Sequence, residues 1–209
     1  MKDKELKEIF ERVCCRSFDS SKTVTIQDLE LIMKAGQAAP SAKNRQPYYF
    51  VGIINKECRY KIYKAAEEGR KKQFGNLSKE ELEKRSTGNT GSNDISIYEA
   101  SAAILVFREL DENYNEAKNQ LENLNIKEEQ GVANATYSMM LQAQHMGLSS
   151  GWICSPLYIE KEIKKILHEY GVVYKDNWRP RAIIPIGYCS RKCIKPQRLP
   201  LGKKSVIIK

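Results

Sequence analysis

The sequence predicts an α+β sandwich, in which helices cover a sheet of a few strands. Three short segments rich in aliphatic, aromatic or β-branched residues are typical of interior strands, at positions 48–54, 102–107 and 181–188. Helical patterns separate these segments, but the short strand–helix–strand crossovers of a Rossmann fold are few. The chain of 209 residues is also within the size range of one folded unit, so we expect a single domain over residues 1–209.

The first part of the chain is expected to form two helices, a loop and a strand. Apolar residues recur at helical spacing between positions 6 and 13. Thr25 followed by Asp28 is typical of a helix start. This second helix must end before Pro40, because the residue before a proline disfavours helical geometry. Positions 40–47 are then a loop that leads into the first strand.

The next part of the chain alternates between helical and flexible patterns. We expect a helix at 56–68 that ends at Gly69, and a short helix that starts at a capping box formed by Ser78 and Glu81. Positions 86–94 are rich in Gly, Ser, Thr and Asn, which predicts a flexible loop. A loop of this kind can act as a lid over a substrate.

The second half of the chain begins with a polar stretch at 111–129, which predicts a surface helix or a mobile excursion with few core contacts. A long helix is expected at 130–146, and another at 159–170 that ends at Gly171. The apolar tail at 205–208 is separated from the preceding chain by prolines and a glycine. Such a tail can leave its own subunit and pair elsewhere.

The formal net charge of +9 favours anionic partners, which include nucleic acids and phosphorylated cofactors. The basic residues are scattered along the chain, with no basic low-complexity tail and no aromatic motif of the kind that stacks bases. We therefore expect no nucleic-acid partner. A basic nucleic-acid-binding protein is a minor alternative, and steeply salt-dependent binding of RNA or DNA by a colourless preparation would reveal it.

The expected compartment follows from the absence of a long apolar segment and from the charged N-terminus, which does not resemble a signal peptide. We expect a cytoplasmic protein without a membrane partner, in which the six cysteines are reduced. Cys14 and Cys15 are adjacent, and Cys189 and Cys193 are four apart. We read no paired zinc-ligand spacing in this pattern and expect no metal.

Two arginines near the N-terminus can bind a phosphate. Arg12 and Arg16 are four residues apart and can clamp a phosphate with bidentate hydrogen bonds, while a small polar residue or a backbone N–H completes the cradle. The alternative is a solvated basic surface. A third arginine, Arg198, lies between two prolines on a rigid loop and is a candidate for the third phosphate ligand.

Two loops have the composition of a binding site for a flat ring. Positions 38–47 combine small residues, which allow close approach of the backbone, with the polar groups of Ser41, Asn44 and Gln46 between two prolines. The alternative is an ordinary helix-to-strand connector. Positions 147–157 predict an extended turn after the long helix, whose backbone N–H groups can meet the edge of the ring.

Taken in order, these segments resemble the nitroreductase family of FMN enzymes. Positions 12–19 are similar to the family's N-terminal phosphate motif, 40–50 to its most recognisable signature, and 131–153 to its long central helix and the turn after it. Positions 183–188 and 198–201 are similar to its last core strand and closing phosphate arginine. The resemblance implies a three-layer α-β-α sandwich with a central mixed or antiparallel sheet. It also implies an obligate, domain-swapped homodimer with two equivalent FMN sites.

The resemblance also implies which residues contact FMN. These are Arg12, Cys14, Arg16 and Arg198 of one subunit and Pro40, Ser41, Ala42 and Asn44 of its partner, with Val13, Cys154 and Ser155 as further contacts. Arg16 would reach the pyrimidine side of the ring. Cys14 stands where the family commonly has Ser, and because a thiol is the weaker donor, the phosphate would rely more on the backbone there.

The implied activity is a ping-pong reaction. NADH or NADPH delivers a hydride to the flavin and leaves, and an electron-poor small molecule such as a nitroaromatic or a quinone then takes the electrons. Because the cofactor performs the redox step, no acid–base triad is required, and Arg16 would stabilise the reduced ring. The alternative is a non-catalytic flavin-binding sensor or carrier, which rapid NAD(P)H oxidation with a quinone would exclude.

Overall fold

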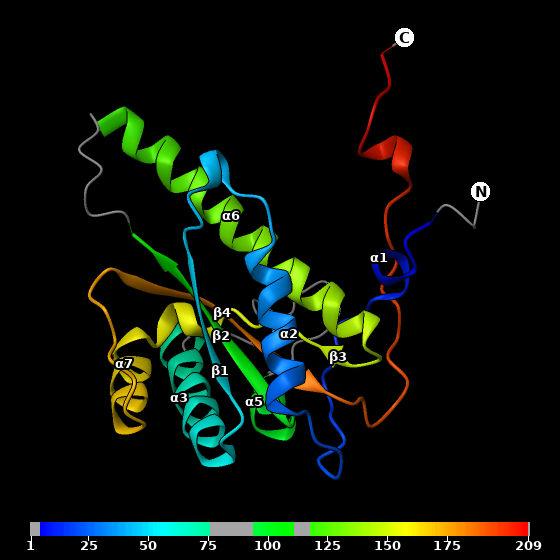
Figure 1. Cartoon of the computed structure of the whole chain (residues 1–209). Helices are drawn as coiled ribbons and strands as arrows, with labels where there is room; N and C mark the ends of the chain where they lie inside the picture. Colours follow the sequence, from blue (N-terminus) through cyan, green and yellow to red (C-terminus); the bar gives the residue numbers. More distant parts are fainter. Residues whose placement is uncertain (1–4, 76–93, 111–117, 209) are drawn as a thin grey trace.

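A four-stranded antiparallel sheet forms the centre of the fold (Figure 1). The computed structural model describes residues 5–75, 94–110 and 118–208. The strands are β1 (Tyr48–Ile53), β2 (Ala102–Glu109), β3 (Ser149–Ser150) and β4 (Trp178–Gly187). They lie in the order β1-β2-β4-β3, and each neighbouring pair is antiparallel. The α+β prediction is therefore confirmed.

The continuous apolar sequence of β2 reflects burial on both faces of the sheet. Successive side chains of a strand point to opposite faces. Those of Ala102, Ile104 and Val106 enter the core on one side, and those of Ala103, Leu105 and Phe107 enter the core on the other. All six residues are fully buried. The sheet therefore lies between two hydrophobic cores, as in a three-layer sandwich.

On one face of the sheet, two helices complete the first core: α2 (Ile26–Gln37) and α6 (Lys118–His145) (Figure 1). The start of α2 is a capping box, because the Thr25 side chain accepts from the Asp28 N–H and the Asp28 carboxylate accepts from the Thr25 N–H. The helix ends before Pro40, as predicted. Gly36 of α2 faces Met139 of α6, and a Cβ at Gly36 would lie 2.8 Å from the Met139 side chain. The two helices therefore pack closely.

The opposite face is covered by α3 (Lys56–Phe74), α5 (Ile95–Glu99) and α7 (Glu160–Glu169). The prediction that the first of these helices ends at Gly69 is wrong. Gly69 is buried inside α3, where a side chain would clash with Ile159. A glycine inside a helix is tolerated where it allows close approach of a neighbour, which explains the misplaced end. The expected end of α7 is correct, since Gly171 follows it with a φ of 77°.

The polar stretch before residue 130 is not the weakly packed segment that its composition predicts. From Lys118 onward it belongs to α6, which continues without a break to His145. Leu124 and Glu128 are buried. The Arg108 side chain, which is 8% exposed, contacts the Glu128 carboxylate at 2.7 Å and Glu129 at 3.1 Å. This buried ion pair fixes α6 against β2, and composition alone hides it because charged residues are usually solvated.

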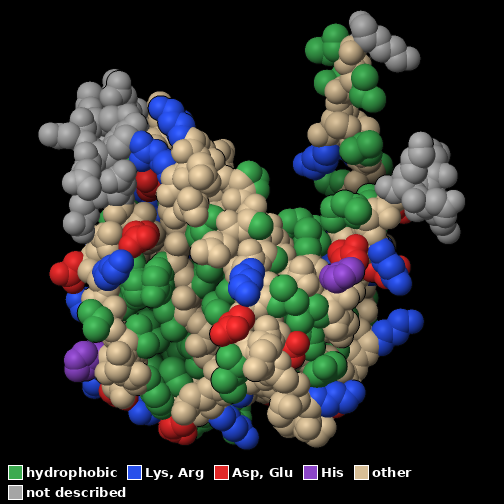
Figure 2. All heavy atoms as spheres, viewed as in Figure 1, with side chains coloured by type: hydrophobic (Ala, Val, Ile, Leu, Met, Phe, Trp, Pro, Cys, Tyr) green, Lys and Arg blue, Asp and Glu red, His purple; other side chains and the backbone are tan. Residues whose placement is uncertain are grey.

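Both ends of the described chain lie away from the sheet (Figure 1). The first helix, α1 (Lys7–Glu11), is short, and Leu6, Ile9 and Phe10 around it are exposed. It is held to α6 by a 2.8 Å hydrogen bond between Glu8 and His145. The C-terminal tail contains only a short 3-10 helix, η4 (Leu201–Lys203). Hydrophobic side chains lie along this tail as it projects from the rest of the chain (Figure 2).

Some predictions fall on residues that the structure does not describe. The short helix predicted from Ser78 and Glu81, and nearly all of the loop at 86–94, lie outside the described residues. Of that loop only Asp94 is described, as the residue that precedes α5. Among the helices that are described, none combines the length and apolar character that crossing a membrane requires.

Candidate functional site

The N-terminal phosphate candidate is an extended segment, residues 12–18, that lies beside the edge strand β3. Cys14 forms a parallel bridge with Ser150, and the Cys15 N–H donates to the Ser150 carbonyl at 2.9 Å. The segment thus extends the sheet beyond β3. Because consecutive side chains of an extended chain alternate, Cys15 is buried while Cys14 is exposed. Val13 is half-buried, and Arg16 is exposed.

Several arginines of the described chain pair with acidic side chains, but the two arginines of this segment, Arg12 and Arg16, do not. Arg108, Arg179 and Arg181 each contact a carboxylate. Within the described residues, the structure shows no carboxylate partner for Arg12 or Arg16. The Arg12 Nη1 atom contacts the Cys14 Sγ atom at 3.5 Å, and its Nε atom is buried without a hydrogen-bond partner. Both guanidinium groups are therefore available to an anion.

Tyr137 contacts the arginine segment, which the sequence did not reveal. The Arg12 guanidinium lies over its ring, 5.8 Å from the centroid. Such a contact is a cation–π interaction, which orients the guanidinium group. The sequence predicts that Tyr137 is in the long helix but gives no signal for the direction of its side chain.

The turn after β3 forms the second part of the site. The Gly151 N–H donates to the Pro185 carbonyl at 3.2 Å, and Ile153 exchanges two backbone hydrogen bonds with Ile183. A Cβ at Gly151 would lie 3.0 Å from the Cys15 carbonyl oxygen, so this glycine allows the turn and the 12–18 segment to touch. Cys154 is exposed, and the buried Ser155 begins the 3-10 helix η3 (Ser155–Tyr158). Within the described residues, the Ser155 hydroxyl has no hydrogen-bond partner.

The loop at 40–47 is an exposed but tightly organised element. Its 3-10 turn is η2 (Ala42–Asn44), and Lys43, Asn44 and Gln46 all have positive φ angles of 51° to 54°. The left-handed region is uncommon for residues other than glycine, and clusters of such residues are typical of functional loops. The Ser41 hydroxyl accepts from the Gln46 N–H at 2.9 Å, which helps to hold this conformation.

The same loop is anchored to α6. The Asn134 side chain donates to the Pro40 carbonyl at 3.2 Å, and a Cβ at Gly131 would lie 3.2 Å from the Ser41 Cβ atom. Pro40, Ala42 and Asn44 are nevertheless exposed. The loop is therefore a rigid, outward-facing surface, and the ordinary-connector alternative does not account for its three left-handed residues.

Arg198 is not brought to the other phosphate candidates within this chain. It lies in the exposed tail, and the structure shows no hydrogen bond or ion pair between it and residues 12–18. The 12–18 segment and the 151–155 turn do meet, at β3. A single chain therefore brings together two of the predicted site segments, residues 12–18 and the turn at 151–155, but not Arg198.

The expectation that all cysteines are reduced is wrong for two of them. Cys15 and Cys189 form a disulfide. Cys14, Cys58, Cys154 and Cys193 are free, although the Cys193 sulfur lies only 2.9 Å from that of Cys189. The pairing joins positions 174 residues apart, so sequence spacing could not show it.

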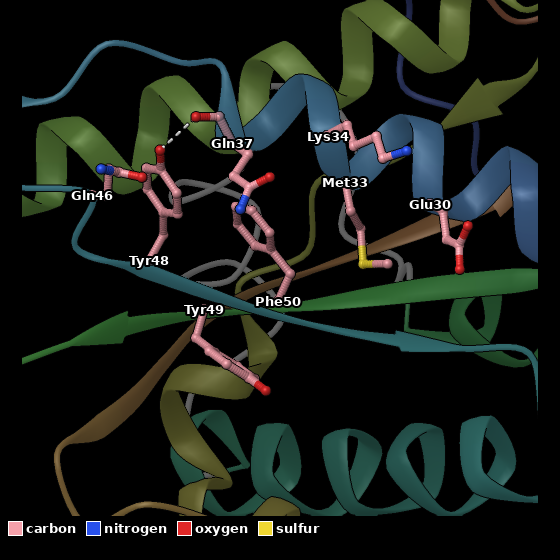
Figure 3. Close-up of a pocket in the computed structure, with 8 residues that line it drawn as sticks. All are labelled: Glu30, Met33, Lys34, Gln37, Gln46, Tyr48, Tyr49 and Phe50. Atoms are coloured by element: carbon pink, nitrogen blue, oxygen red, sulfur yellow. Dashed lines mark hydrogen bonds between the residues drawn. The ribbon is translucent and has the colours of Figure 1, made fainter. Parts of the chain in front are cut away.

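A pocket of about 430 Å³ lies away from the 12–18 segment, between α2 and the edge strand β1 (Figure 3). It is lined by Glu30, Met33, Lys34, Gln37, Gln46, Tyr48, Tyr49 and Phe50. Tyr48 points toward α2 and donates to the Gln37 carbonyl at 2.8 Å, whereas Tyr49 points to the other side of the strand (Figure 3). The pocket therefore opens at the side of β1 that has no neighbouring strand among the described residues.

A comparison of the sequence with models of known protein families supports the resemblance described above. The sequence model of the nitroreductase family matches residues 9–188. The chain belongs to the nitroreductase family. The matched region contains the arginine segment, the left-handed loop and the turn after β3, and it ends before the C-terminal tail.

The proteins that this chain resembles carry different functional names. An iodotyrosine deiodinase of Haliscomenobacter hydrossis is 25% identical over 192 residues, which cover 90% of this chain and 81% of that one. Among solved structures, a BluB-like flavoprotein of Clostridium difficile has a TM-score of 0.80 at 23% identity, covering 97% of this chain and 98% of the other. A nitroreductase of Bacteroides fragilis with bound FMN has a TM-score of 0.67 at 20% identity, covering 97% of each chain. These structural likenesses confirm the nitroreductase fold.

Proposed function

We propose that this chain is an FMN-dependent oxidoreductase that uses NADH or NADPH to reduce electron-poor small molecules. The observation that carries the proposal is the pair Arg12 and Arg16, which have no carboxylate partner in the described chain and lie on a segment bonded to the edge of the sheet. Two guanidinium groups without acidic partners on one ordered segment suit a phosphorylated cofactor, with one guanidinium at its phosphate and the other at its ring.

The residues around β3 fit a bound phosphorylated cofactor. The Arg12 Nε atom and the Ser155 hydroxyl are buried without a partner in the two segments that flank β3. An unsatisfied buried polar group costs about 1–3 kcal/mol, so a ligand that bonds to these atoms would be favoured. Solved relatives with bound FMN support the assignment of FMN as that ligand.

When bound, FMN supplies hydride acceptance and donation. The chain's own part is to bind and orient the ring. Arg12 and Cys14 would hold the phosphate end, with Val13 beside them. Arg16 would place a positive charge at the pyrimidine side, where negative charge develops on reduction. Cys154 and Ser155, in the turn after β3, would contact the ring edge.

We also propose a homodimer in which the partner completes each site. The left-handed loop supports this arrangement, because Pro40, Ala42 and Asn44 are exposed on an organised turn and Ser41 beside them is half-buried. We assign all four residues to the contact with the partner's cofactor. In the dimer this loop contacts the cofactor that the partner's arginine segment holds. The exposed apolar residues of α1, among them Leu6 and Phe10, are suited to the same interface.

The C-terminal tail is the second element that we assign to the dimer. Val206, Ile207 and Ile208 are 82–92% exposed in the isolated chain. The edge of β1 that has no neighbouring strand in the described part of the chain offers backbone groups to an extended segment, and an apolar tail from a second copy can add there as a strand. This exchange would also carry Arg198 to the partner, which agrees with its exposure and with the lack of a bond to residues 12–18 in the described chain.

The test is steady-state oxidation of NADH and NADPH with a quinone and a nitroaromatic as acceptors. Parallel double-reciprocal plots at several acceptor concentrations are expected, because a ping-pong reaction releases the oxidised nucleotide before the acceptor binds. Turnover by neither nucleotide with either acceptor, in protein that retains FMN, would favour the sensor or carrier alternative.

A second candidate activity is reductive dehalogenation of a halogenated phenol. The similarity to an iodotyrosine deiodinase over 90% of this chain favours it. The fold shared with a deiodinase structure that holds FMN and 3-iodo-L-tyrosine, with a TM-score of 0.70 at 24% identity, also favours it. Iodide release from 3-iodo-L-tyrosine by the chemically reduced protein would support this activity. If iodide is not released while quinones are reduced, the dehalogenase candidate fails and the first proposal stands.

A further inference from the structure

A group of three cysteines lies at the junction between the N-terminal arginine segment and the end of β4. The Sγ atoms of Cys15, Cys189 and Cys193 are all within 4.8 Å of one another. Cys15 is buried, and the other two are half-buried. We call this group the cysteine triad. It shares the 12–18 segment with the proposed flavin contacts but uses the buried Cys15 side chain, and its residues do not line the pocket at β1.

The backbone builds the triad by pairing two segments that are far apart in the sequence. The Asp19 N–H donates to the Tyr188 carbonyl at 2.8 Å, and the Ser190 N–H donates to the Ser17 carbonyl at 3.1 Å. Phe18 and Cys189 form an antiparallel bridge between these bonds. The sulfur atoms therefore meet at a position that main-chain hydrogen bonds define.

A structural disulfide explains only two of these three cysteines. Cys15 and Cys189 are bonded to each other, and that bond has no need of a third thiol. The Cys193 sulfur nevertheless lies 2.9 Å from that of Cys189, packed against the small apolar cluster formed with Phe18 and Ala100. A third sulfur held this close to a disulfide points to a shared ligand in the reduced state.

We propose that the reduced cysteine triad is a binding site for one thiophilic divalent metal ion of the Zn²⁺ class. From the cysteine spacing alone we expected no metal, but Cys189 and Cys193 are separated by three residues, a separation that paired zinc ligands can have. The fold brings Cys15 to them as the third thiolate. In a tetrahedral site with Zn–S bonds of about 2.3 Å, the sulfur atoms are about 3.8 Å apart. The triad reaches this geometry by small side-chain movements. The fourth ligand would come from outside the triad, for example a water molecule.

The chemical balance requires one reductant. A dithiol donates two electrons and two protons to the Cys15–Cys189 disulfide, which becomes two thiols, while the dithiol becomes a disulfide. The metal ion then binds three thiolates and releases the three thiol protons. The site is therefore closed to metal in the oxidised chain and open in the reduced chain, and in both states a covalent or coordinate link ties residue 15 to the end of β4.

The experiment is a Co²⁺ titration of the metal-free full chain in two states. One sample keeps the disulfide, and the other is reduced with excess dithiothreitol and desalted without oxygen. We expect only the reduced chain to bind one Co²⁺, with the thiolate-to-cobalt absorption in the near ultraviolet and tetrahedral bands in the visible, and Zn²⁺ to displace it. A reduced chain without these bands, or an oxidised chain that gives the same bands, would overturn the proposal.

The decisive variant is Cys193→Ser, because it leaves the Cys15–Cys189 disulfide intact and the oxidised chain folded as before. We expect its affinity for Co²⁺ in the reduced state to fall by at least about tenfold, with weaker charge-transfer absorption. The matched control is Cys58→Ala, which removes a free cysteine buried in the core that α3 covers. If Cys193→Ser binds Co²⁺ as tightly as Cys58→Ala, the triad is not the metal site.

Discussion

Arg16 carries the most specific residue-scale claim, since it is an exposed guanidinium without an acidic partner in the described chain. Replacing it with Ala should weaken FMN binding by about 1.5–3 kcal/mol, the range for hydrogen bonds to charged groups, or roughly tenfold to a hundredfold. It should also slow flavin reduction by NAD(P)H. The two quantities are measured by quenching of FMN fluorescence and by anaerobic stopped-flow absorbance.

The control for this variant is Arg179→Ala. Arg179 is also an arginine near the surface, but it pairs with Glu160 of α7 at 3.6 Å. Its loss should leave FMN affinity and flavin reduction unchanged. Equal behaviour of the two variants would remove Arg16 from the site.

At the scale of elements, the ion pair between Arg108 of β2 and Glu128 of α6 decides how the long helix is held. The two side chains are 8% and 3% exposed, and their charged atoms are 2.7 Å apart. Arg108→Ala leaves the buried Glu128 carboxylate with only the more distant Arg45, at 3.9 Å, which should reduce the free energy of unfolding by about 3 kcal/mol. Urea denaturation followed by circular dichroism measures this change.

A matched exposed pair shows whether burial is the cause. Lys61 and Glu169 lie 2.8 Å apart with both side chains 39% exposed. Lys61→Ala should change the free energy of unfolding by no more than about 1 kcal/mol. A comparable loss in both variants would mean that burial does not set the strength of the Arg108 pair.

The elements that sequence reasoning predicted well are those whose pattern reflects local burial. The strand expected at 48–54 is β1, and the apolar run from Ala102 is β2, because alternation and β-branched content report directly on the two cores. The misplaced end at Gly69 and the missed start of α6 have a different origin. The glycine inside α3 is explained by its contact with Ile159, and the start of α6 by the pair between Glu128 and Arg108 of β2. Both are contacts between different elements, which the pattern of one element does not show.

The sequence likewise predicts only part of the candidate site. The arginine spacing and the small, amide-rich loop are local features, so the sequence shows them. The orientation of Tyr137 and the proximity of Cys15, Cys189 and Cys193 depend on which segments the sheet brings together. No local pattern carries that information, because the paired segments are more than a hundred residues apart.

On the scale of the whole molecule, the proposed exchange of C-terminal tails predicts that dimer formation and FMN binding are lost together. Deleting residues 196–209 removes Arg198 and the apolar tail while keeping all six cysteines. We expect a monomer–dimer equilibrium shifted toward the monomer in sedimentation, and FMN that is removed by gel filtration.

A second variant separates the two contributions of the tail. Replacing Val206, Ile207 and Ile208 with Ser keeps Arg198 but removes the apolar contacts of the exposed segment. It should weaken the dimer, because each buried aliphatic side chain contributes about 1.5–3 kcal/mol. A fully dimeric truncated chain with normal FMN content would show that the tail is not exchanged.

The flavin assignment itself is tested most directly by the visible absorbance spectrum of the purified protein, recorded before and after anaerobic addition of NADH or NADPH. The account predicts a flavin spectrum that bleaches with at least one of the two nucleotides. A colourless protein that also fails to take up added FMN would contradict it, and a flavin spectrum that does not bleach would leave the chain a flavin-binding protein without the proposed reductase activity.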